Sequence, residues 1–459
     1  MYQINFQNPV HVHFIGIGGI SMSGLAAILL KEGFSVSGSD AKESSLTDWL
    51  TGLGASVYYG QTAANIHDDV DVVVYTAAIH PDNPEYAAAV QKGIPMLTRA
   101  QLLGELMQNY EMPVAVAGTH GKTTTTSMLA HMMMEGRLDP TISVGGILPS
   151  IGGNVRLGAS GTFLTEACEY TNSFLELFPK ISIILNIDAD HLDFFKDLDD
   201  IRHSFHLFAE KLPADGTLII QSDIPELSAF VSDLDCRVIT YGIGSGDYHA
   251  SDISYDGQGF GSFELMKNGV PSGRYTLSVP GDHNISNAVA ALAAGDLLGL
   301  TREQMAAGLL SFTGTERRFQ KKGEVGGVTI IDDYANNPTD IDATLRAAEK
   351  YPHKTVWCVF QPHTYTRTKA LMDEFASALS HTDKVILADI YAARETDNLG
   401  ISSDTLRQKL ADLGKEAWYF PTFDEIETFL LKNCVPGDLI ITMGAGDVVK
   451  IGEKLLGIG

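Results

Sequence analysis

The sequence predicts an α/β protein with several domains and mostly parallel sheets. Over all 459 residues, short apolar strands alternate with amphipathic helices, which is the pattern of βαβ units. At three places an apolar strand runs into a glycine-rich turn, beginning at Gly16, Gly118 and Gly444. A chain of this length holds roughly two to four domains. Since no repeat with a period of about 20–50 residues is present, a solenoid is excluded.

Three segments can be delimited from the expected strands. The first ends near Leu106, and a polar stretch at 108–112 separates it from the second. The third begins after 311–315, and a long helix is expected before it, at 284–298. We expect strands at 10–15 and 70–75 in the first segment, at 114–117, 163–165 and 181–186 in the second, and at 328–332, 355–360, 384–387 and 439–443 in the third.

The composition excludes some classes of function. Lys and Arg total 32 against 57 Asp and Glu, which gives a net charge of −25 and argues against a nucleic-acid partner, because such proteins present a basic face. With no apolar run of 18 residues and no signal peptide, we expect no membrane partner. The four cysteines are too scattered for a disulfide framework or a CxxC metal site, so a reducing cytoplasm is the expected location. They are Cys168, Cys236, Cys358 and Cys434.

The first glycine-rich turn, Gly16-Ile17-Gly18-Gly19-Ile20-Ser21, lies between a strand and a helix. Glycines let a diphosphate approach the backbone, and a helix N-terminus supplies free N–H groups and a positive dipole end. Ser21 replaces the last glycine of G-x-G-x-x-G, so three interpretations stay open: a dinucleotide dehydrogenase, another nucleotide or UDP-sugar site, and a tight structural turn. Asp40, which follows Ser39 at the end of the next strand, stands where an acid meets a ribose hydroxyl, or is simply solvated.

The second glycine-rich turn, Gly118-Thr119-His120-Gly121-Lys122-Thr123-Thr124, is a P-loop with a shortened front end. Val116 stands where the G-x-x-x-x-G-K-[ST] pattern has its first glycine. Backbone N–H groups of such a loop cradle phosphates, Lys122 can neutralise the β- and γ-phosphate oxygens, and the Thr123 hydroxyl can bind Mg²⁺. The position between a strand and a helix therefore predicts binding of a nucleoside triphosphate.

Candidate metal ligands follow at the ends of the next two strands. Glu166 could hold one metal ion and His191 a second one, since ligands collect at the carboxyl ends of parallel strands. His191 could equally be a helix-entry histidine bonded to a neighbouring carboxylate. The acidic residues around it could cap a helix or be solvated. They are Asp188, Asp190 and Asp193.

Two asparagines open the long helix expected in the second segment. Asn284 and Asn287 lie one turn apart and therefore on the same face. Their carboxamides could bind a purine edge, because each group donates and accepts hydrogen bonds. The alternative is an N-cap followed by an amide that faces solvent.

The third segment carries arginines suited to an anionic ligand. Arg318 lies at its start, and Arg367 follows the strand at 355–360. A guanidinium binds a phosphate or carboxylate through two parallel hydrogen bonds, so either arginine could complete a site when domains close, or form an interdomain salt bridge. The third glycine-rich turn, Gly444–Asp447, is expected to be mainly structural.

These motifs occur in one fixed order that resembles the Mur ligase family of bacterial cell-wall synthesis, and within it the alanine-adding branch. Besides the two glycine loops, the resemblance rests on GIGGISMSG, GTHGKTT, EACEY, the DH of Asp190-His191, HNxxN, DDYAxxP, FQPHTYTRT and the terminal GAGD. It spans nearly the whole chain.

The resemblance implies an ATP-dependent ligase with three domains. These are a Rossmann-like domain for the UDP-sugar at 1–108, a P-loop domain for ATP and Mg²⁺ at 109–313, and a second Rossmann-like domain at 314–459 that closes on ATP and the amino acid. The implied reaction joins L-alanine to the lactyl carboxylate of UDP-N-acetylmuramate through an acyl phosphate and releases ADP and phosphate. The implied cofactors are ATP and one or two Mg²⁺ ions, and the expected assembly is a monomer or a homodimer.

The resemblance also implies a role for each matching residue. The UDP-sugar is assigned to Gly16, Gly18, Gly19, Ser39 and Asp40, and the amino-acid side to Tyr334, His363 and Arg367. ATP is assigned to Gly118, Thr119, His120, Gly121, Lys122, Thr123, Thr124, Asn284, Asn287, Arg318 and Asp333. The metal is assigned to Thr123, Glu166 and His191, and catalysis to Lys122, Glu166, His191 and Arg318.

Two departures from the family bear on function. Asn336 and Asn337 replace the two histidines of the usual DDY(A/G)HHP pattern, and an amide cannot shuttle a proton near neutral pH. The helix expected around 201–208 has no lysine, so we predict none of the carbamylated lysine found in sister ligases. Two alternatives stay open: a related ligase that attaches another amino acid or a recycled peptide to the same sugar, and a catalytically weakened nucleotide-binding regulator.

Overall fold

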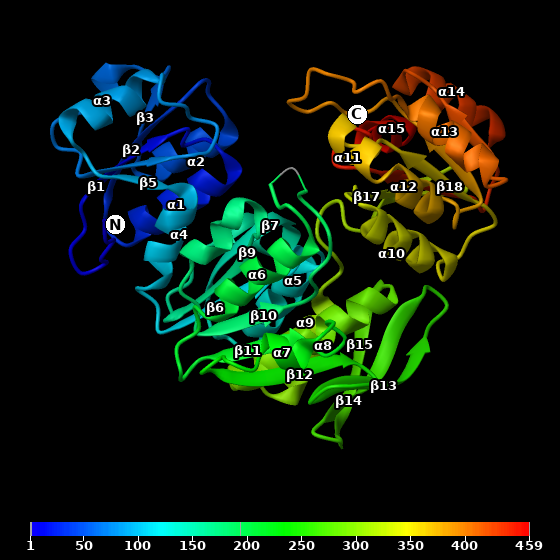
Figure 1. The fold of residues 1–459 in the computed structure, drawn as a ribbon, viewed down its shortest axis with the longest axis horizontal. Coiled ribbons are helices and arrows are strands. Elements are labelled where there is room, and N and C mark those ends of the chain that lie inside the picture. Colours follow the sequence, from blue (N-terminus) through cyan, green and yellow to red (C-terminus); the bar gives the residue numbers. More distant parts are fainter. Residues whose placement is uncertain (1, 193, 459) are drawn as a thin grey trace. The chain divides into compact units, whose positions relative to one another are not determined.

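A computed structural model describes residues 2–192 and 194–458 of the chain (Figure 1). The chain forms two compact units, each assembled from several stretches of sequence. Unit 1 consists of Met1–Asp188, Leu198–Thr240 and Ala290–Met305, and unit 2 of Ala189–Asp197, Tyr241–Val289 and Ala306–Gly459. None of the described helices is long and apolar enough to cross a membrane.

Unit 1 begins with a five-stranded parallel sheet in the order β3-β2-β1-β4-β5. The strand order changes direction beside β1, and ligands of such doubly wound sheets bind at that point, outside the carboxyl ends of the strands. This topology confirms the predicted Rossmann-like fold. The elements are β1 (His11–Ile15), α1 (Ile20–Lys31), β2 (Ser35–Asp40), α2 (Ser45–Leu53), β3 (Ser56–Tyr59), β4 (Val72–Tyr75), α3 (Pro84–Lys92), β5 (Met96–Thr98) and α4 (Arg99–Met107).

Side-chain caps fix where these helices begin and end. Ser44 accepts a hydrogen bond from the backbone N–H of Thr47 and so starts α2, and Thr98 does the same for α4 through Gln101. Gly54 ends α2 in the left-handed conformation at φ 108°, which costs a glycine little. The α1 N-terminus differs, because Gly19 at its cap has no side chain that could satisfy the first N–H groups.

The second sheet of unit 1 has the order β12-β11-β10-β6-β9-β7-β8. Its central strands β11, β10, β6, β9 and β7 are parallel, and β8 is antiparallel to β7. Strands β6, β9, β10 and β11 are almost wholly buried, as expected for a parallel sheet covered on both faces. The elements are β6 (Met112–Ala117), α5 (Lys122–Glu135), β7 (Thr141–Leu148), β8 (Gly153–Arg156), β9 (Thr162–Ala167), β10 (Ile181–Ile184), α6 (Leu198–Ala209), β11 (Thr217–Gln221), α7 (Leu227–Phe230) and β12 (Arg237–Ile243).

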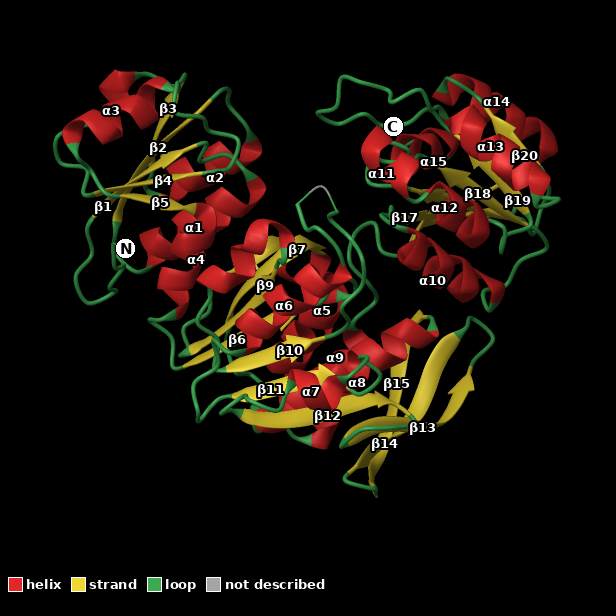
Figure 2. Cartoon of the chain, viewed as in Figure 1, coloured by secondary structure: helices red, strands yellow, loops and turns green. Residues whose placement is uncertain are grey.

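Unit 2 contains a six-stranded sheet in the order β16-β17-β21-β18-β19-β20, parallel except for β16. Helices cover both faces (Figure 2): α10, α12 and α13 pack on one hydrophobic core, and α14 and α15 on the other. The elements are β16 (Gln320–Val325), β17 (Val328–Asp333), α10 (Pro338–Glu349), β18 (Val356–Phe360), α11 (Tyr365–Ala370), α12 (Met372–Leu379), β19 (Lys384–Leu387), α13 (Ser403–Asp412), β20 (Ala417–Tyr419), α14 (Phe423–Asn433), β21 (Leu439–Met443) and α15 (Val449–Leu455).

Unit 2 also contains a three-stranded antiparallel meander. It is made of β13 (Tyr248–Tyr255), β14 (Phe260–Lys267) and β15 (Val270–Pro280), and it leads into α8 (Asp282–Leu297), which is followed in the chain by α9 (Arg302–Ser311). The helix agrees with the one predicted at 284–298, whereas the meander was not predicted. The strands predicted in the three segments all exist, with ends that differ by at most two residues from the predicted ones.

Candidate active site

The first glycine-rich turn follows β1 and leads into α1. Gly16 has a φ of 85°, which favours glycine at this position. A Cβ on Gly18 would lie 2.8 Å from the Asp40 carboxylate, which would have to move aside. The Asp40 Oδ2 atom accepts a hydrogen bond from the Gly18 N–H at 2.8 Å. The Ser39 side chain is buried, and its hydroxyl donates to Glu85. The five residues predicted for the UDP-sugar therefore gather at this turn, with the Ser39 side chain directed into the interior.

The second glycine-rich turn follows β6 and leads into α5, whose first residue is Lys122. Gly118 and Gly121 both have a positive φ, 147° and 83°, so the turn depends on them. The backbone N–H of His120 donates to Asn186 at the end of β10, and Thr119 bonds to the backbone of Asp188. The loop is thus anchored to the neighbouring strand end, as in a preformed phosphate site.

Lys122 is held by three oxygens inside this loop. Its Nζ atom donates to the carbonyl groups of Gly118 and Thr119 and lies 2.8 Å from Glu169 Oε2. Burial lowers the pKa of Lys122, but the charge of Glu169 and the hydrogen bond to it, together with the effects of Cys168 and Glu166, outweigh burial and raise the pKa above its ordinary value. The lysine is therefore a permanent cation at neutral pH, as binding of a phosphate requires.

Thr123 and Glu166 form a pair of oxygen donors beside the loop. The Thr123 hydroxyl donates to Glu166 Oε2 at 3.1 Å, and the Gly145 N–H donates to Glu166 Oε1 at 2.6 Å. A hydroxyl and a carboxylate oxygen at this spacing fit Mg²⁺, which prefers oxygen ligands and keeps several waters. The structure brings these two predicted metal ligands together.

His191 belongs to unit 2, at a positive φ of 52°. Its backbone N–H donates to Asp190 Oδ1, and Asp190 forms an ion pair with Arg367 at 3.3 Å. Arg367 also donates to Asn336 Oδ1 at 2.5 Å. Asp193, the remaining acid of this segment, lies outside the described residues.

Arg318 and Asp333 lie where β17 ends. Asp333 accepts hydrogen bonds from the N–H groups of Phe319 and Ala335. Burial raises the pKa of Asp333 to about 6, and the charge of Arg318 opposes this rise. The Arg318 guanidinium lies 5.5 Å from the centre of the Tyr334 ring. These three predicted residues are therefore neighbours.

Asn284 and Asn287 are both buried at the start of α8, which rules out the solvent-facing amide considered above. The Asn284 amide donates to the Pro280 carbonyl at 2.7 Å, and the Asn287 amide donates to Asn284 at 3.3 Å. His363 is half-buried and stacks on Tyr391 with ring centres 5.7 Å apart. Burial and the charge of Arg367 lower the pKa of His363.

The structure adds residues that sequence reasoning missed. Glu169 was part of a quoted motif, EACEY, but received no role. Arg317 pairs with Asp332 and donates to the carbonyls of Gly444 and Gly446, so it ties down the third glycine-rich turn, in line with the structural role predicted for that turn. Two adjacent arginines after the segment boundary were the only available signal for Arg317.

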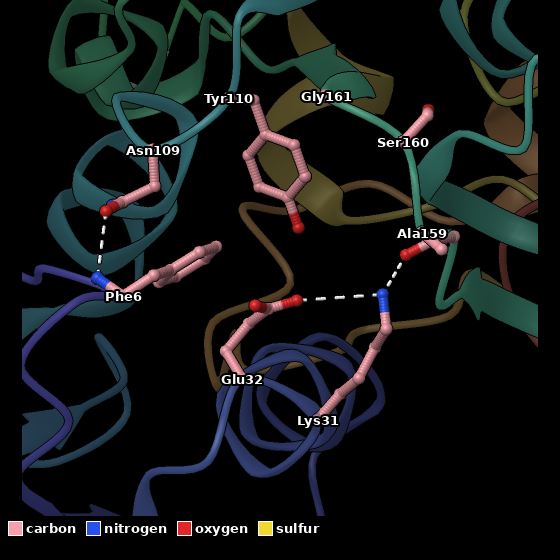
Figure 3. Close-up of a pocket in the computed structure, with 9 residues that line it drawn as sticks. Phe6, Lys31, Glu32, Asn109, Tyr110, Ala159, Ser160 and Gly161 are labelled. Carbon is pink, nitrogen blue, oxygen red and sulfur yellow. Dashed lines mark hydrogen bonds and ion pairs between the residues drawn. The ribbon is translucent and has the colours of Figure 1, made fainter.

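A cavity of about 220 Å³ also lies in unit 1 (Figure 3). Its lining includes Lys31, Glu32 and Tyr110, and the Lys31 Nζ atom donates to the carbonyl of Gly158. Burial raises the pKa of Tyr110 to about 12. None of the predicted site residues lines this cavity.

Three family models match the chain in succession. They are the catalytic domain of the Mur ligase family at residues 11–111, the Mur ligase middle domain at 116–295, and the Mur ligase glutamate ligase domain at 317–446.

Named relatives span the full length of the chain. The UDP-N-acetylmuramate–L-alanine ligase of Lachnospira eligens is 60% identical, and that of Agathobacter rectalis 58%; each alignment covers 99% of this chain and 100% of the relative.

Solved structures agree with these matches. The UDP-N-acetylmuramate–alanine ligase of Thermotoga maritima superposes with a TM-score of 0.79 at 30% identity, covering 97% of this chain and 98% of that one. A murein peptide ligase of Psychrobacter arcticus has a TM-score of 0.69 at 24% identity with 98% of both chains covered, and shows the fold alone. The fold, the P-loop beside its carboxylate, the three successive domain models and the full-length relatives lead to one conclusion: the chain belongs to the Mur ligase family.

Proposed function

We propose that this chain joins L-alanine to the lactyl carboxylate of UDP-N-acetylmuramate and converts ATP to ADP and phosphate. The observation that carries the proposal is the 60% identity, over the full length, to a relative named for that reaction. The buried Lys122 cation and the Thr123–Glu166 pair supply the groups that phosphoryl transfer needs.

The reaction has two steps. In the first, a lactyl carboxylate oxygen attacks the γ-phosphorus of ATP, the bond from that phosphorus to the β,γ-bridging oxygen breaks, and ADP leaves with the electron pair. In the second, the alanine amine attacks the acyl carbon and inorganic phosphate leaves, while the amine loses a proton. Phosphoryl transfer is catalysed mainly by positioning and by charge stabilisation. Lys122 stabilises the negative charge on the transferring group.

The Thr123 hydroxyl and the Glu166 carboxylate would hold Mg²⁺, and His191 a second ion. When bound, Mg²⁺ offsets charge on the phosphate oxygens. Asn284 and Asn287 bind adenine, Arg318 and Asp333 contact ATP, and the glycine turn at Gly16–Gly19 with Asp40 receives the UDP moiety. Tyr334, His363 and Arg367 face the alanine. The three domains span 1–108, 109–313 and 314–459, and the enzyme acts as a monomer or homodimer without a nucleic-acid or membrane partner.

A phosphate-release assay tests the proposal. With UDP-N-acetylmuramate, ATP, Mg²⁺ and L-alanine together, we expect steady release of phosphate and a product one alanyl residue heavier. Omitting any one component should abolish release. Release that does not depend on the sugar nucleotide would contradict the proposal, and the Lys122→Ala variant controls for contaminating ATPases.

A second candidate is a ligase that attaches a preformed peptide to the same sugar. It is kept because a Neisseria meningitidis protein named as UDP-N-acetylmuramate:L-alanyl-γ-D-glutamyl-meso-diaminopimelate ligase is 31% identical, with a TM-score of 0.61 and 68% of this chain covered. The same assay with that tripeptide in place of L-alanine decides: a higher kcat/KM for the tripeptide favours the second candidate.

A third candidate is a regulator that binds both nucleotides without turnover, and the observation that favours it is the replacement of the two histidines by Asn336 and Asn337. Tight binding of UDP-N-acetylmuramate and ATP with no phosphate release would support this role. Substitution of both asparagines by histidine should then restore turnover.

A further inference from the structure

Unit 1 carries a histidine between two carboxylates, outside the candidate active site. The His206 Nε2 atom lies 3.6 Å from Glu210 Oε1 and 3.4 Å from Asp233 Oδ2. One ligand atom of each side chain lies within 4.8 Å of the other two. Over residues 2–192 and 194–458, no other three His, Cys, Asp or Glu side chains converge this closely. The three residues therefore form a candidate metal site.

Two separate segments of unit 1 supply these side chains. His206 lies in the last turn of α6, and the Glu210 N–H donates to the His206 carbonyl at 2.9 Å. The helical geometry thus continues to Glu210, and residues four apart lie on the same face of a helix. Asp233 follows α7, in the connection between β11 and β12. A metal ion bound here would link the end of α6 to that connection.

The imidazole of His206 is already oriented for a metal. Its Nδ1 atom lies 3.0 Å from the Phe230 carbonyl, and a carbonyl can only accept, so Nδ1 is the donor. The neutral ring then carries its lone pair on Nε2. The Phe230 ring also meets the imidazole edge to face, with centres 5.3 Å apart at 84°. Metal-binding histidines commonly donate their other ring N–H to a carbonyl in this way.

The two separations from Nε2 fit a metal better than they fit hydrogen bonds. N–H···O hydrogen bonds in proteins span about 2.7–3.2 Å, and both separations, 3.4 and 3.6 Å, are longer. A tetrahedral ion with bonds of about 2.1 Å holds its ligand atoms about 3.4 Å apart, whereas adjacent ligands of an octahedral ion with the same bonds lie about 3.0 Å apart. The geometry therefore matches tetrahedral coordination.

The charges at this site also favour a cation. Within the described part of the chain, neither Glu210 nor Asp233 has a lysine or arginine nitrogen within ion-pair distance; each pairs with His206. Two carboxylates that converge on one point repel each other. A divalent cation between them would neutralise both and would use the lone pair of the imidazole.

We propose that His206, Glu210 and Asp233 bind Zn²⁺, with water in the fourth position. Zn²⁺ accepts histidine nitrogen and carboxylate oxygen in a tetrahedral arrangement, whereas Mg²⁺ and Ca²⁺ prefer six or more oxygen ligands. The site is separate from the Thr123–Glu166 pair and does not rest on the proposed function. Because it joins two segments of unit 1, its effect is on the stability of that unit rather than on the reaction.

Calorimetric titration with Zn²⁺ tests the proposal. Each titration uses the full-length chain without a purification tag and with the substitution Glu166→Gln, which weakens the candidate Mg²⁺ site. We expect His206→Gln to raise the Kd for Zn²⁺ at least about 100-fold, because loss of groups that merely support a ligand already costs about 10–100-fold. Asp233→Asn should raise Kd at least about tenfold, since its amide oxygen is only a weak ligand.

Two further readouts identify the kind of site. Zn²⁺ should raise the unfolding temperature of the parent protein, as any ligand of the native state does, and should have a much smaller effect on His206→Gln. Co²⁺ in place of Zn²⁺ should give the intense visible absorption of a tetrahedral ion rather than the weak absorption of an octahedral one.

Two controls accompany these measurements. His381→Gln removes a partly exposed histidine that pairs with one aspartate, Asp342, and should leave the Kd for Zn²⁺ unchanged. Asp233 is 62% exposed, so Asp233→Asn should fold normally and, without Zn²⁺, unfold at the temperature of the parent protein. This variant keeps the test valid if His206→Gln folds poorly.

Three outcomes would overturn the proposal. The first is a parent protein that binds Zn²⁺ no more tightly than His206→Gln does. The second is Zn²⁺ affinity that falls in His206→Gln but persists in both Asp233→Asn and Glu210→Gln, which would leave the histidine as the sole ligand. The third is an octahedral Co²⁺ spectrum. None of these measurements involves ligation, so their failure would leave the proposed function intact.

Discussion

Glu169 Oε2 lies 2.8 Å from Lys122 Nζ, and the carboxylate side chain is only 2% exposed. A buried carboxylate is thus the ion-pair partner of the lysine that the P-loop directs at phosphate. A bound triphosphate must share this lysine with Glu169 or displace it. The pair therefore keeps the lysine charged and positioned before the nucleotide arrives.

Lys122→Ala should reduce kcat by about 10²–10³, which corresponds to roughly 3–4 kcal/mol of lost charge stabilisation in the transition state. The measurement is phosphate release at saturating ATP, with Lys180→Ala, which removes a partly exposed lysine paired with Asp215, as the control. Lys122→Ala removes the cation beside the buried Glu169 carboxylate and should therefore lower thermal stability. The Lys122→Ala/Glu169→Gln double variant should regain thermal stability but not turnover. Near-normal turnover in Lys122→Ala would refute the assigned role.

Glu166→Gln should raise the Mg²⁺ concentration needed for half-maximal turnover by at least about tenfold, an effect that even groups supporting a metal ligand produce. The amide oxygen can still accept the hydrogen bond from the Gly145 N–H, and the amide N–H can donate to the Thr123 hydroxyl instead of accepting from it, so the fold should be preserved while the charge on the ligand is lost. Titration of activity with Mg²⁺ measures the shift. An identical titration curve in the variant would remove Glu166 from the metal site.

Asn336→His should introduce a pH dependence into the KM for L-alanine. Asn336 accepts a hydrogen bond from Arg367, and a neutral imidazole could take over this role above its ordinary pKa of about 6.5. Below that pH the imidazolium would repel the guanidinium. We expect similar KM values for variant and wild type at pH 8, and a severalfold higher KM for the variant at pH 6. If the KM for L-alanine depended on pH in the same way in the variant and the wild type, Asn336 would not position Arg367 for the substrate.

Asp333→Asn should change how stability depends on pH. The pKa of Asp333 is raised to about 6 in the folded protein, above its unfolded value of about 3.9. The folded state therefore binds the proton more tightly than the unfolded state does. The resulting contribution to stability is fully present below about pH 4 and is lost as the pH rises through 6. It amounts to roughly 3 kcal/mol in the free energy of unfolding.

Thermal unfolding of both proteins between pH 4 and 8 checks this. The unfolding free energy of the wild type relative to Asp333→Asn should fall as pH rises through that window and then level off. A difference between the two proteins that stays constant with pH would contradict the raised pKa.

Much of the fold could be predicted because its signals are local. Strands such as 384–387 are continuous apolar runs, and the turns at Gly16 and Gly118 carry glycines where φ is positive. The meander of β13–β15 was not predicted because its strands alternate polar and apolar residues instead of forming continuous apolar runs, even though each strand pairs with its neighbour in the chain.

Some contacts of the candidate site could also be predicted from the sequence, and others could not. The contact between Thr123 and Glu166 could be predicted, because both residues follow or end parallel strands, whose carboxyl ends lie at one edge of the sheet. The contact of Asn336 with Arg367 joins residues 31 positions apart, and that of Glu169 with Lys122 joins residues 47 apart. No spacing rule predicts such pairs; they depend on how the loops after different strands fold onto each other.

The division into two units has a consequence for dissecting the enzyme. The chain passes from one unit to the other after residues 188, 197, 240, 289 and 305, so neither unit is a continuous piece of sequence. A fragment cut at any single peptide bond would leave at least one unit without part of its interior. Exchange with a relative by one crossover inside 189–305 is therefore expected to yield insoluble chimeras, whereas a crossover near residue 108, which keeps all five strands of the first sheet on one side, should be tolerated.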